Sequence, residues 1–264
     1  MAAKSFFRFF WRLMKTNVSH SYSLKLNFWL EALFMVVNDV MYFSVWIILF
    51  HSFKEINGWG VGHMMLMEGI VVGAYSIYAF CFRGVAEVLA GQIERGELDT
   101  FILQPRNILL NLAGSRSHPA ALGDVITGFV FLFWSGMTTF QTLPLILLSV
   151  IVGFLTFLSL GIFVGSLAFY MKDVEGWGQQ IINIFIHVGN QPGSIYTGDV
   201  RLFLTFVFPV GLITFMPIEM ITNPTFSGIF AFVGLIAMFF SASIWFFYRG
   251  LKRYESGNIF GVRG

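Results

Sequence analysis

The sequence contains little charge. Charged residues make up 11% of its 264 positions, against about 25% in an average soluble domain. Hydrophobic types reach 56%, and 33 residues are phenylalanine, so the chain cannot cover a water-facing surface with polar groups. The same composition excludes intrinsic disorder, which requires low hydrophobicity and high charge. Lipid must therefore be the solvent for most of the chain.

Motifs for catalysis and for cofactor binding are also missing. The sequence has no G-x-x-x-x-G-K-[ST] phosphate loop, no H-E-x-x-H zinc motif and no G-x-S-x-G nucleophile motif. Its single cysteine, Cys81, cannot form an internal disulfide, and its five histidines are scattered, so we expect them to be interfacial polar residues. A net charge of +2 is too small for a nucleic-acid-binding protein. We therefore predict a non-enzymatic chain with no catalytic residue, no metal ligand and no directly bound cofactor.

Long apolar runs are abundant, and they predict an all-α integral membrane protein. A spanning helix needs about 20 mostly apolar residues. We predict a single transmembrane domain over residues 1–264, with six spans at residues 28–50, 64–82, 119–136, 144–170, 177–190 and 226–248. Helix-breaking residues from Gly189 to Gly193 end the fifth span, and we expect the segment 193–221 to form a broken re-entrant hairpin in the outer leaflet. Six spans place both termini on the same side.

The basic residues are distributed very unevenly over this topology. Fourteen of the sixteen lie before the first span, in the loops after the second and fourth spans, or after the last span. Only Lys54 and Arg201 fall on the opposite side. Because lysine and arginine accumulate in cytoplasmic loops, we predict that both termini are cytoplasmic.

The N-terminal segment is predicted to form a basic amphipathic helix at residues 4–20. At about 100° per residue, its basic side chains fall within an arc of about 80°, and apolar residues occupy the rest. These interfacial anchors are Lys4, Arg8, Arg12 and Lys15. Such a helix lies in the membrane interface, either as a simple anchor or as an elbow that couples the spans to a cytoplasmic partner.

Four polar residues interrupt the first two apolar spans. They are Glu31, Asn38, Asp39 and Glu68. A charge at mid-bilayer costs about 3 kcal/mol or more, so such groups face the bundle interior or water. Glu31 and Asp39 share one helix face, so they could line a translocation path or a subunit interface. For Glu31 and Glu68 we favour positions at the inner and outer interfaces, with Glu31 paired to Lys25 or to the N-terminal helix; Asp39 is the deep one.

Two G-x-x-x-G patterns occur inside predicted spans. They are Gly69–Gly73 in the second span and Gly161–Gly165 in the fourth. Small residues at this spacing let helix backbones approach closely. The patterns therefore favour tight helix packing at these two places.

The loop between the second and third spans contains a short amphipathic helix, predicted at residues 85–96. Val85, Val88 and Leu89 follow helical spacing, and Gly96 suits the position that ends a helix. A charged helix that projects from a membrane domain suits docking onto a soluble partner. It would equally suit a position on the lipid headgroups.

Four stretches occur in an order that is typical of one transporter family. They are Ile93–Asp99 followed by Leu103–Pro105, then Asn190–Tyr196, Phe208–Pro209 with Met216–Pro217, and Tyr248–Gly257. In this order and spacing, which cover essentially the whole chain, the sequence resembles the six-span permease subunits of type-2 ABC transporters. Gln191 departs from that family, which more often has an aromatic residue before the proline.

The resemblance implies a division of labour between subunits. Two permease subunits, identical or homologous, would form the membrane core of an exporter, and each would bind a separate ATPase subunit that carries ATP and magnesium. The 85–96 helix would couple to the ATPase, and the outer hairpin would be the gate. The coupling residues would be Glu87, Gln92, Glu94, Arg95 and Glu97, and the gate residues Pro192, Pro209 and Pro217. The implied location is the bacterial inner membrane, with lipid around the chain and no nucleic-acid partner. An apolar, phenylalanine-rich path would suit lipid-like, glycan-linked or hydrophobic cargo.

Three other functions remain as alternatives. An ion-coupled secondary transporter would work without an ATPase, but it predicts inverted repeats and several deep titratable groups, for which Asp39 is the one fair candidate. A lipid-modifying enzyme predicts converging His, Asp or Ser side chains near one interface. A scaffold protein would need neither a gate nor a nucleotide-dependent movement.

Overall fold

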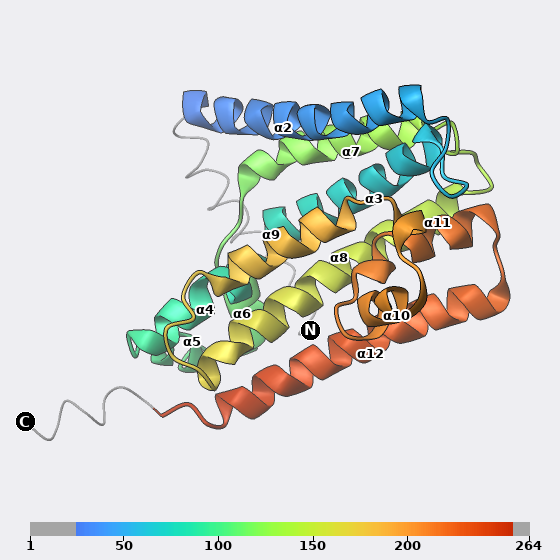
Figure 1. Ribbon diagram of the computed structural model, residues 1–264. Helices are drawn as coiled ribbons and strands as arrows, with labels where there is room; N and C mark the ends of the chain where they lie inside the picture. The colour runs from blue at the N-terminus through green and yellow to red at the C-terminus, as the bar shows by residue number, and fades with distance from the viewer. Residues whose placement is uncertain (1–24, 256–264) are drawn as a thin grey trace, which may run out of the picture.

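The computed structural model describes residues 25–255, which are helical apart from their connecting turns and one isolated bridge. The predicted all-α fold is confirmed. Six helices make up the body of the bundle, and all of them run lengthwise across the view of Figure 1. They are α2 (Lys25–Ser52), α3 (Val61–Cys81), α7 (Leu122–Trp134), α8 (Leu143–Ser166), α9 (Trp177–Gly189) and α12 (Phe226–Leu251). The predicted N-terminal helix at 4–20, with Lys4, Arg8, Arg12 and Lys15, lies outside the described residues.

Four described helices are long and apolar enough to cross a membrane. They are Leu26–Ser52, Val61–Cys81, Leu143–Phe169 and Phe226–Leu251. The predicted spans at 119–136 and 177–190 are shorter helices, because the apolar helix at Pro119–Trp134 is under 18 residues and α9 has 13. Multiple membrane-capable helices are therefore present, and the number of six crossings remains a prediction.

The predicted broken hairpin consists of two short helices. In this segment α10 (Gly198–Phe206) and the stretch Val210–Thr222, which contains α11 (Phe215–Thr222), are apolar enough to pass the membrane test together, but they are bent by 82°. The break coincides with Pro209, whose ring removes a backbone donor. The bend prevents this pair from acting as one straight span.

The two ends of the bundle differ in structure. Three short helices lie at one end, where α2 begins and α12 ends (Figure 1). They are α4 (Gly84–Glu94), α5 (Asp99–Ile102) and α6 (Ile108–Gly114). The turns from α2 to α3 and from α7 to α8 lie at the opposite end, together with the turn from α11 to α12. The first and last described residues are therefore at the same end.

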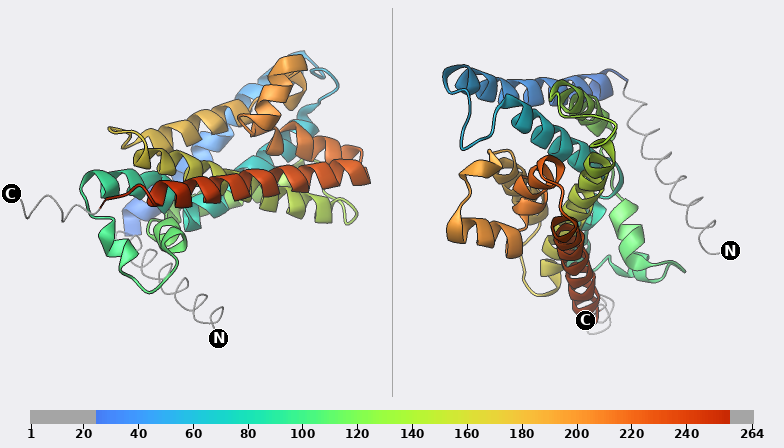
Figure 2. Two further views of the ribbon diagram at one scale, coloured as in Figure 1. Left: turned by 90° about the horizontal axis from the view of Figure 1, so that it is seen from below. Right: turned by 90° about the vertical axis from the view of Figure 1, so that its right-hand side faces the viewer.

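The middle helices carry the core, and the edge helices face outward. Figures 1 and 2 agree that α2 and α12 lie at opposite edges, with α3 and α8 between them. In the most apolar 18-residue stretch of each helix, the buried share is 67% for α3 and 56% for α8, against 11% for α2 and 17% for α12. Large apolar side chains such as Phe34 and Phe230 are exposed on the edge helices. A surface of exposed apolar side chains is what a lipid solvent requires.

Glycines let the helices approach closely, as the two G-x-x-x-G patterns predict. A Cβ on Gly69 would meet Leu132 of α7, and a Cβ on Gly161 would meet the ring of Tyr78 on α3. Gly165 of α8 faces the backbone carbonyl of Val85 on α4. The same glycine pattern thus joins the spans to the short helix at the end of the bundle.

The predicted short helix is present as α4. It covers Gly84–Glu94, and Gly96 follows with φ of +67°. The amide of Gly96 donates to the carbonyl of Ile93 (3.1 Å) and the amide of Glu97 to that of Gln92 (2.8 Å). This pair of bonds is the Schellman ending, which favours glycine because of the left-handed backbone. Gly96 therefore ends the helix, as predicted.

We expect Gly165→Ala to destabilise the protein, by about 1–3 kcal/mol, because its Cβ would press on the Val85 backbone and force α4 away from α8. The control is Gly234→Ala on α12, where no atom lies within 4 Å of the added Cβ. That change should leave stability unchanged or raise it by up to about 1 kcal/mol. Thermal unfolding of the detergent-purified variants measures both; equal melting temperatures would contradict the packing described here.

Candidate functional site

A cavity of about 570 Å³ lies among α2, α3, α7 and α9. Its lining is unusually polar for the interior of an apolar bundle. The acids and amides that line it include Glu31, Asn38, Asp39, Glu68, Asp124 and Asn183. These side chains come from helices that are far apart in the sequence. Tertiary packing therefore collects the polar groups of the spans into one place.

All four predicted intramembrane polar residues line this cavity. Glu31 and Asn38 are exposed and Asp39 is half-buried, whereas Glu68 is 2% exposed. Glu68 is enclosed by the neighbouring helices two turns into α3, and its expected position at the outer interface stays a prediction. The pairing expected for Glu31 with Lys25 or the N-terminal helix falls on side chains outside the described part.

Asp124 is a cavity residue that sequence reasoning missed. It lies in the first turn of α7 and is 5% exposed. The rule that singled out Glu31 and Asp39, an acid within an apolar span, applies equally to Asp124, because it lies inside the predicted span 119–136. Because it lies near the start of that span, it resembles a residue of the membrane interface.

Two histidines also line the cavity, His118 before α7 and His187 on α9. Burial, followed by the positive charge of Arg83, lowers the pKa of His118, and the carboxylates of Glu31 and Glu87 only partly oppose this. A pKa below the ordinary value near 6.5 leaves His118 neutral at pH 7. Among residues 25–255, no group of three or more His, Cys, Asp or Glu side chains is arranged to hold a metal ion.

Hydrogen bonds join α2 to the segment after α9 at the end of the bundle far from α4. The amide Nε2 of Gln191 donates to the hydroxyl of Tyr42 (3.1 Å), and that hydroxyl donates to the carbonyl of Asn190 (3.4 Å). Ser194 donates to the carbonyl of Ile56 in the turn between α2 and α3 (2.9 Å). These bonds connect the segment after α9, which includes the buried Pro192, to α2 and to the turn between α2 and α3.

A polar network connects the cavity to α4. Arg83, which precedes α4, donates from Nε to Glu87 (2.6 Å) and from Nη2 to Gln179 on α9 (2.8 Å). Gln179 in turn donates to Asn183 (2.9 Å), which lines the cavity. Arg116 approaches the same Glu87 carboxylate (3.7 Å). These contacts join α4 to α9, and α9 to the cavity.

The C-terminal end of α4 carries several charged side chains. Glu94 and Arg95 are exposed, and Arg95 contacts Glu97 (3.2 Å) and Glu175 in the turn before α9 (3.4 Å). Gln92 also donates to Glu97 (3.2 Å). Of the five predicted coupling residues, Glu87 differs, because its side chain is 18% exposed and is held by Arg83 and Arg116. The remaining four form a polar tip, in which Glu94, Arg95 and Glu97 are exposed and Gln92 is half-buried.

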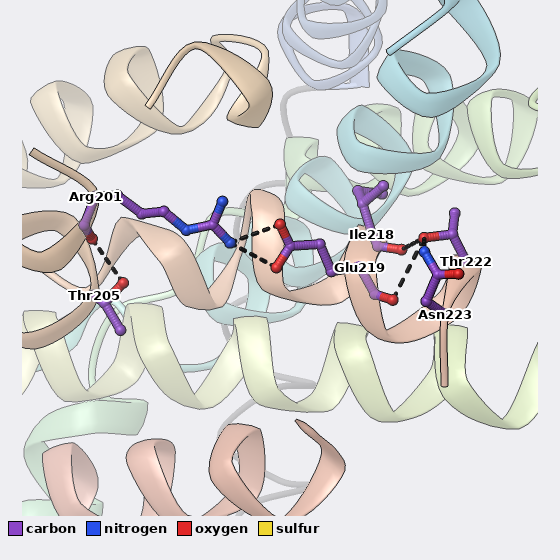
Figure 3. A network of polar contacts seen from close by, with 6 residues as sticks. All are labelled: Arg201, Thr205, Ile218, Glu219, Thr222 and Asn223. Atoms are coloured by element: carbon purple, nitrogen blue, oxygen red, sulfur yellow. Dashed lines mark hydrogen bonds and ion pairs between the residues drawn. The ribbon is translucent and has the colours of Figure 1, made fainter. Parts of the chain in front are cut away.

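The bent pair α10–α11 is fastened by one ion pair, which Figure 3 shows at close range. Arg201 of α10 donates from Nη2 to both carboxylate oxygens of Glu219 on α11, each at 2.6 Å. The Arg201 guanidinium also lies 4.3 Å from the ring centroid of Phe215. The two remaining predicted gate residues are also buried: Pro209 lies at the break and Pro217 lies within α11. The hairpin is therefore held both by contacts within itself and by packing of its apolar side chains, such as Phe215, in the core of the bundle.

Comparison with known proteins identifies a family for this arrangement. Residues 36–258 match the family described as ABC-2 family transporter protein. The matched range covers most of the chain, including most of the cavity lining, α4 and the bent pair α10–α11. The searches of curated proteins and of solved structures found no match.

We predict a measurable coupling between Arg201 and Glu219 in a double-mutant cycle with Arg201→Met, Glu219→Gln and the double variant. The two side chains are 37% and 52% exposed, so solvent screening limits the coupling to about 0.5–1 kcal/mol. The double variant should thus melt about 1–4 °C higher than the sum of the single losses predicts. Strictly additive losses in melting temperature would show that the pair contributes nothing to the hairpin.

Proposed function

The chain belongs to the ABC-2 family of transporter proteins, and on that premise we propose that it is the permease subunit of an ATP-driven exporter powered by separate ATPase subunits. The match over residues 36–258 is the observation that carries the proposal. Membership makes the chain a multi-pass component of an ABC transporter with an ABC ATPase as its partner. The alternative of an ion-coupled transporter is not favoured by this family.

The proposed orientation puts the end with α4, α5 and α6 in the cytoplasm of the cell, with both termini on that side of a bacterial inner membrane. Basic residues support it: Arg83, Arg95 and Lys172 lie at the α4 end, as do Lys252 and Arg253 just after α12. Lys54 and Arg201 are the basic residues in segments assigned to the other end. Positive residues are retained on the cytoplasmic side of membrane proteins.

The proposed ATPase contact is the polar tip of α4, formed by Gln92, Glu94, Arg95 and Glu97. The N-terminal part of α4 is tightly packed, because Gly165 of α8 and Gly178 of α9 both allow the α4 backbone to approach closely. A push on the tip would therefore move α8 and α9 together with α4 instead of bending a loop. The Arg83–Gln179 bond provides a polar link to α9 in the same direction.

The proposed path is the cavity among α2, α3, α7 and α9, and the proposed gate is the fastened segment around Pro192 with the bent pair α10–α11. The contacts of Tyr42 with Gln191 and Asn190, which join α2 to the segment after α9, support this assignment. Movement of α9 by ATPase closure would separate these residues, since an ATP-driven shift needs different contacts in its two states. Two permease copies or two homologues with two ATPase subunits would complete the exporter, and its proposed cargo is lipid-like, glycan-linked or hydrophobic.

The test is charge reversal at the α4 tip, with Glu94→Lys and Arg95→Glu measured separately. We expect the tagged wild-type chain to co-purify with an ATPase and to hydrolyse no ATP when isolated. In either variant, the amount of co-purified ATPase should fall by a factor of about five or more. Glu55→Lys is the matched control, because Glu55 is exposed in the turn at the opposite end.

The fold of each variant is checked by its melting temperature, which should change little because Arg95 makes only exposed ion pairs. Unchanged ATPase recovery and unchanged transport in both tip variants would remove α4 from the proposed contact. ATP hydrolysis by the isolated chain would contradict the division of labour.

A further inference from the structure

Three carboxyl groups from three helices share the polar cavity. They are Asp39 of α2, Glu68 of α3 and Asp124 of α7. Glu68 and Asp124 are 2% and 5% exposed, respectively. Bringing three acids together inside a lipid-embedded bundle is costly, because each loses water and each repels the others. Such a cluster requires compensation from outside the chain or from its own side chains.

The described side chains supply only part of that compensation. Oε1 of Glu68 and Oδ2 of Asp39 are buried without a hydrogen-bond partner among the described residues. A carboxyl oxygen in this state is an acceptor whose desolvation penalty is uncompensated. Glu68 is almost completely enclosed and lines the cavity, so its carboxyl group lies in the wall that a bound molecule would contact.

Positive charge is also missing from the described lining. No lysine or arginine of residues 26–255 lines the cavity. The nearest candidate, Arg83, is engaged by Glu87 and Gln179, and His118 is neutral at pH 7 for the reasons given above. The cavity is therefore acidic without an internal counter-ion among these residues.

The rest of the lining is apolar and aromatic. Phe34, Val71 and Ile186 contribute apolar surface, and Tyr42 and Tyr75 contribute rings. Aromatic faces attract cations in addition to burying hydrophobic groups. A volume of about 570 Å³ lies within the ordinary range for small-molecule sites.

We propose that this cavity binds lipophilic organic cations, with Glu68 and Asp39 as the counter-charges and the aromatic wall around the hydrophobic body of the molecule. This rests on the proposed transport function and narrows its cargo to hydrophobic compounds that carry a positive charge. Asp124 adds to the negative potential of the same cavity. A bound cation offsets part of the negative charge of the three carboxyl groups and so lowers the repulsion between them.

The experiment compares two ions of nearly equal shape and opposite charge, tetraphenylphosphonium and tetraphenylborate. Binding to the purified permease–ATPase complex is measured by equilibrium dialysis with displacement by unlabelled ion, and stimulation of ATP hydrolysis is measured alongside. We expect the wild-type complex to bind the phosphonium at least about tenfold more tightly than the borate, and the phosphonium to stimulate ATP hydrolysis.

The decisive variant is Glu68→Gln, which keeps the shape of the side chain and removes its charge. It should weaken phosphonium binding about tenfold or more, while Glu55→Gln, in the exposed outer turn, should leave it unchanged. If Glu68→Gln does not give a monodisperse complex, the half-buried Asp39→Asn takes its place, with a weakening of about threefold or more as the expected result.

Equal binding of the two ions, or phosphonium binding that survives the neutralising change in the variant that gives a monodisperse complex, overturns the cation site. With basal ATP hydrolysis intact, either result leaves the proposed transporter in place and refutes only the cargo class. Failure of the proposed function is separate and has its own readout, because then no ATPase would associate with the chain at all.

Discussion

The lipid solvent is the constraint on which the rest of this structure depends. It cannot hydrogen-bond with the chain, so every polar group within a span must find a place among the other helices or in a water-filled space. Asp39, Glu68 and Asp124 lie on three different helices, yet all three line the same cavity. The edge helices α2 and α12 meanwhile present apolar side chains outward. One solvent rule thus accounts for both the apolar surface and the polar interior.

Small residues allow the helices of this bundle to contact one another through their backbones. Gly165 and Gly178 bring α8 and α9 against the backbone of α4, while Gly69 brings α3 against α7. In parallel, Arg83 and Gln179 join the start of α4 to the cavity wall at Asn183. A permease must transmit force between an ATPase at one end and a path in the middle. Close backbone contact and a short polar relay are two physical means of doing so, and both converge on α9.

Most of the helices could be predicted from sequence because long apolar runs and helix-breaking residues are local properties. The end of α9 at Gly189, the break at Pro209 and the Schellman ending at Gly96 all follow from residues in the immediate neighbourhood. The burial of Glu68 could not be predicted, because it depends on which helices pack around α3. Asp124 is an acid near the start of a predicted span, and only packing shows that it shares a cavity with Asp39.

The most direct test is the structure of this chain bound to its ATPase, determined by electron cryomicroscopy with and without a non-hydrolysable ATP analogue. The account predicts that the ATPase contacts the α4 tip from Gln92 to Glu97, and that the analogue shifts α9 and separates Gln191 from Tyr42. An ATPase seated on the outer turn between α2 and α3, or an α4 tip left bare in the complex, would contradict it.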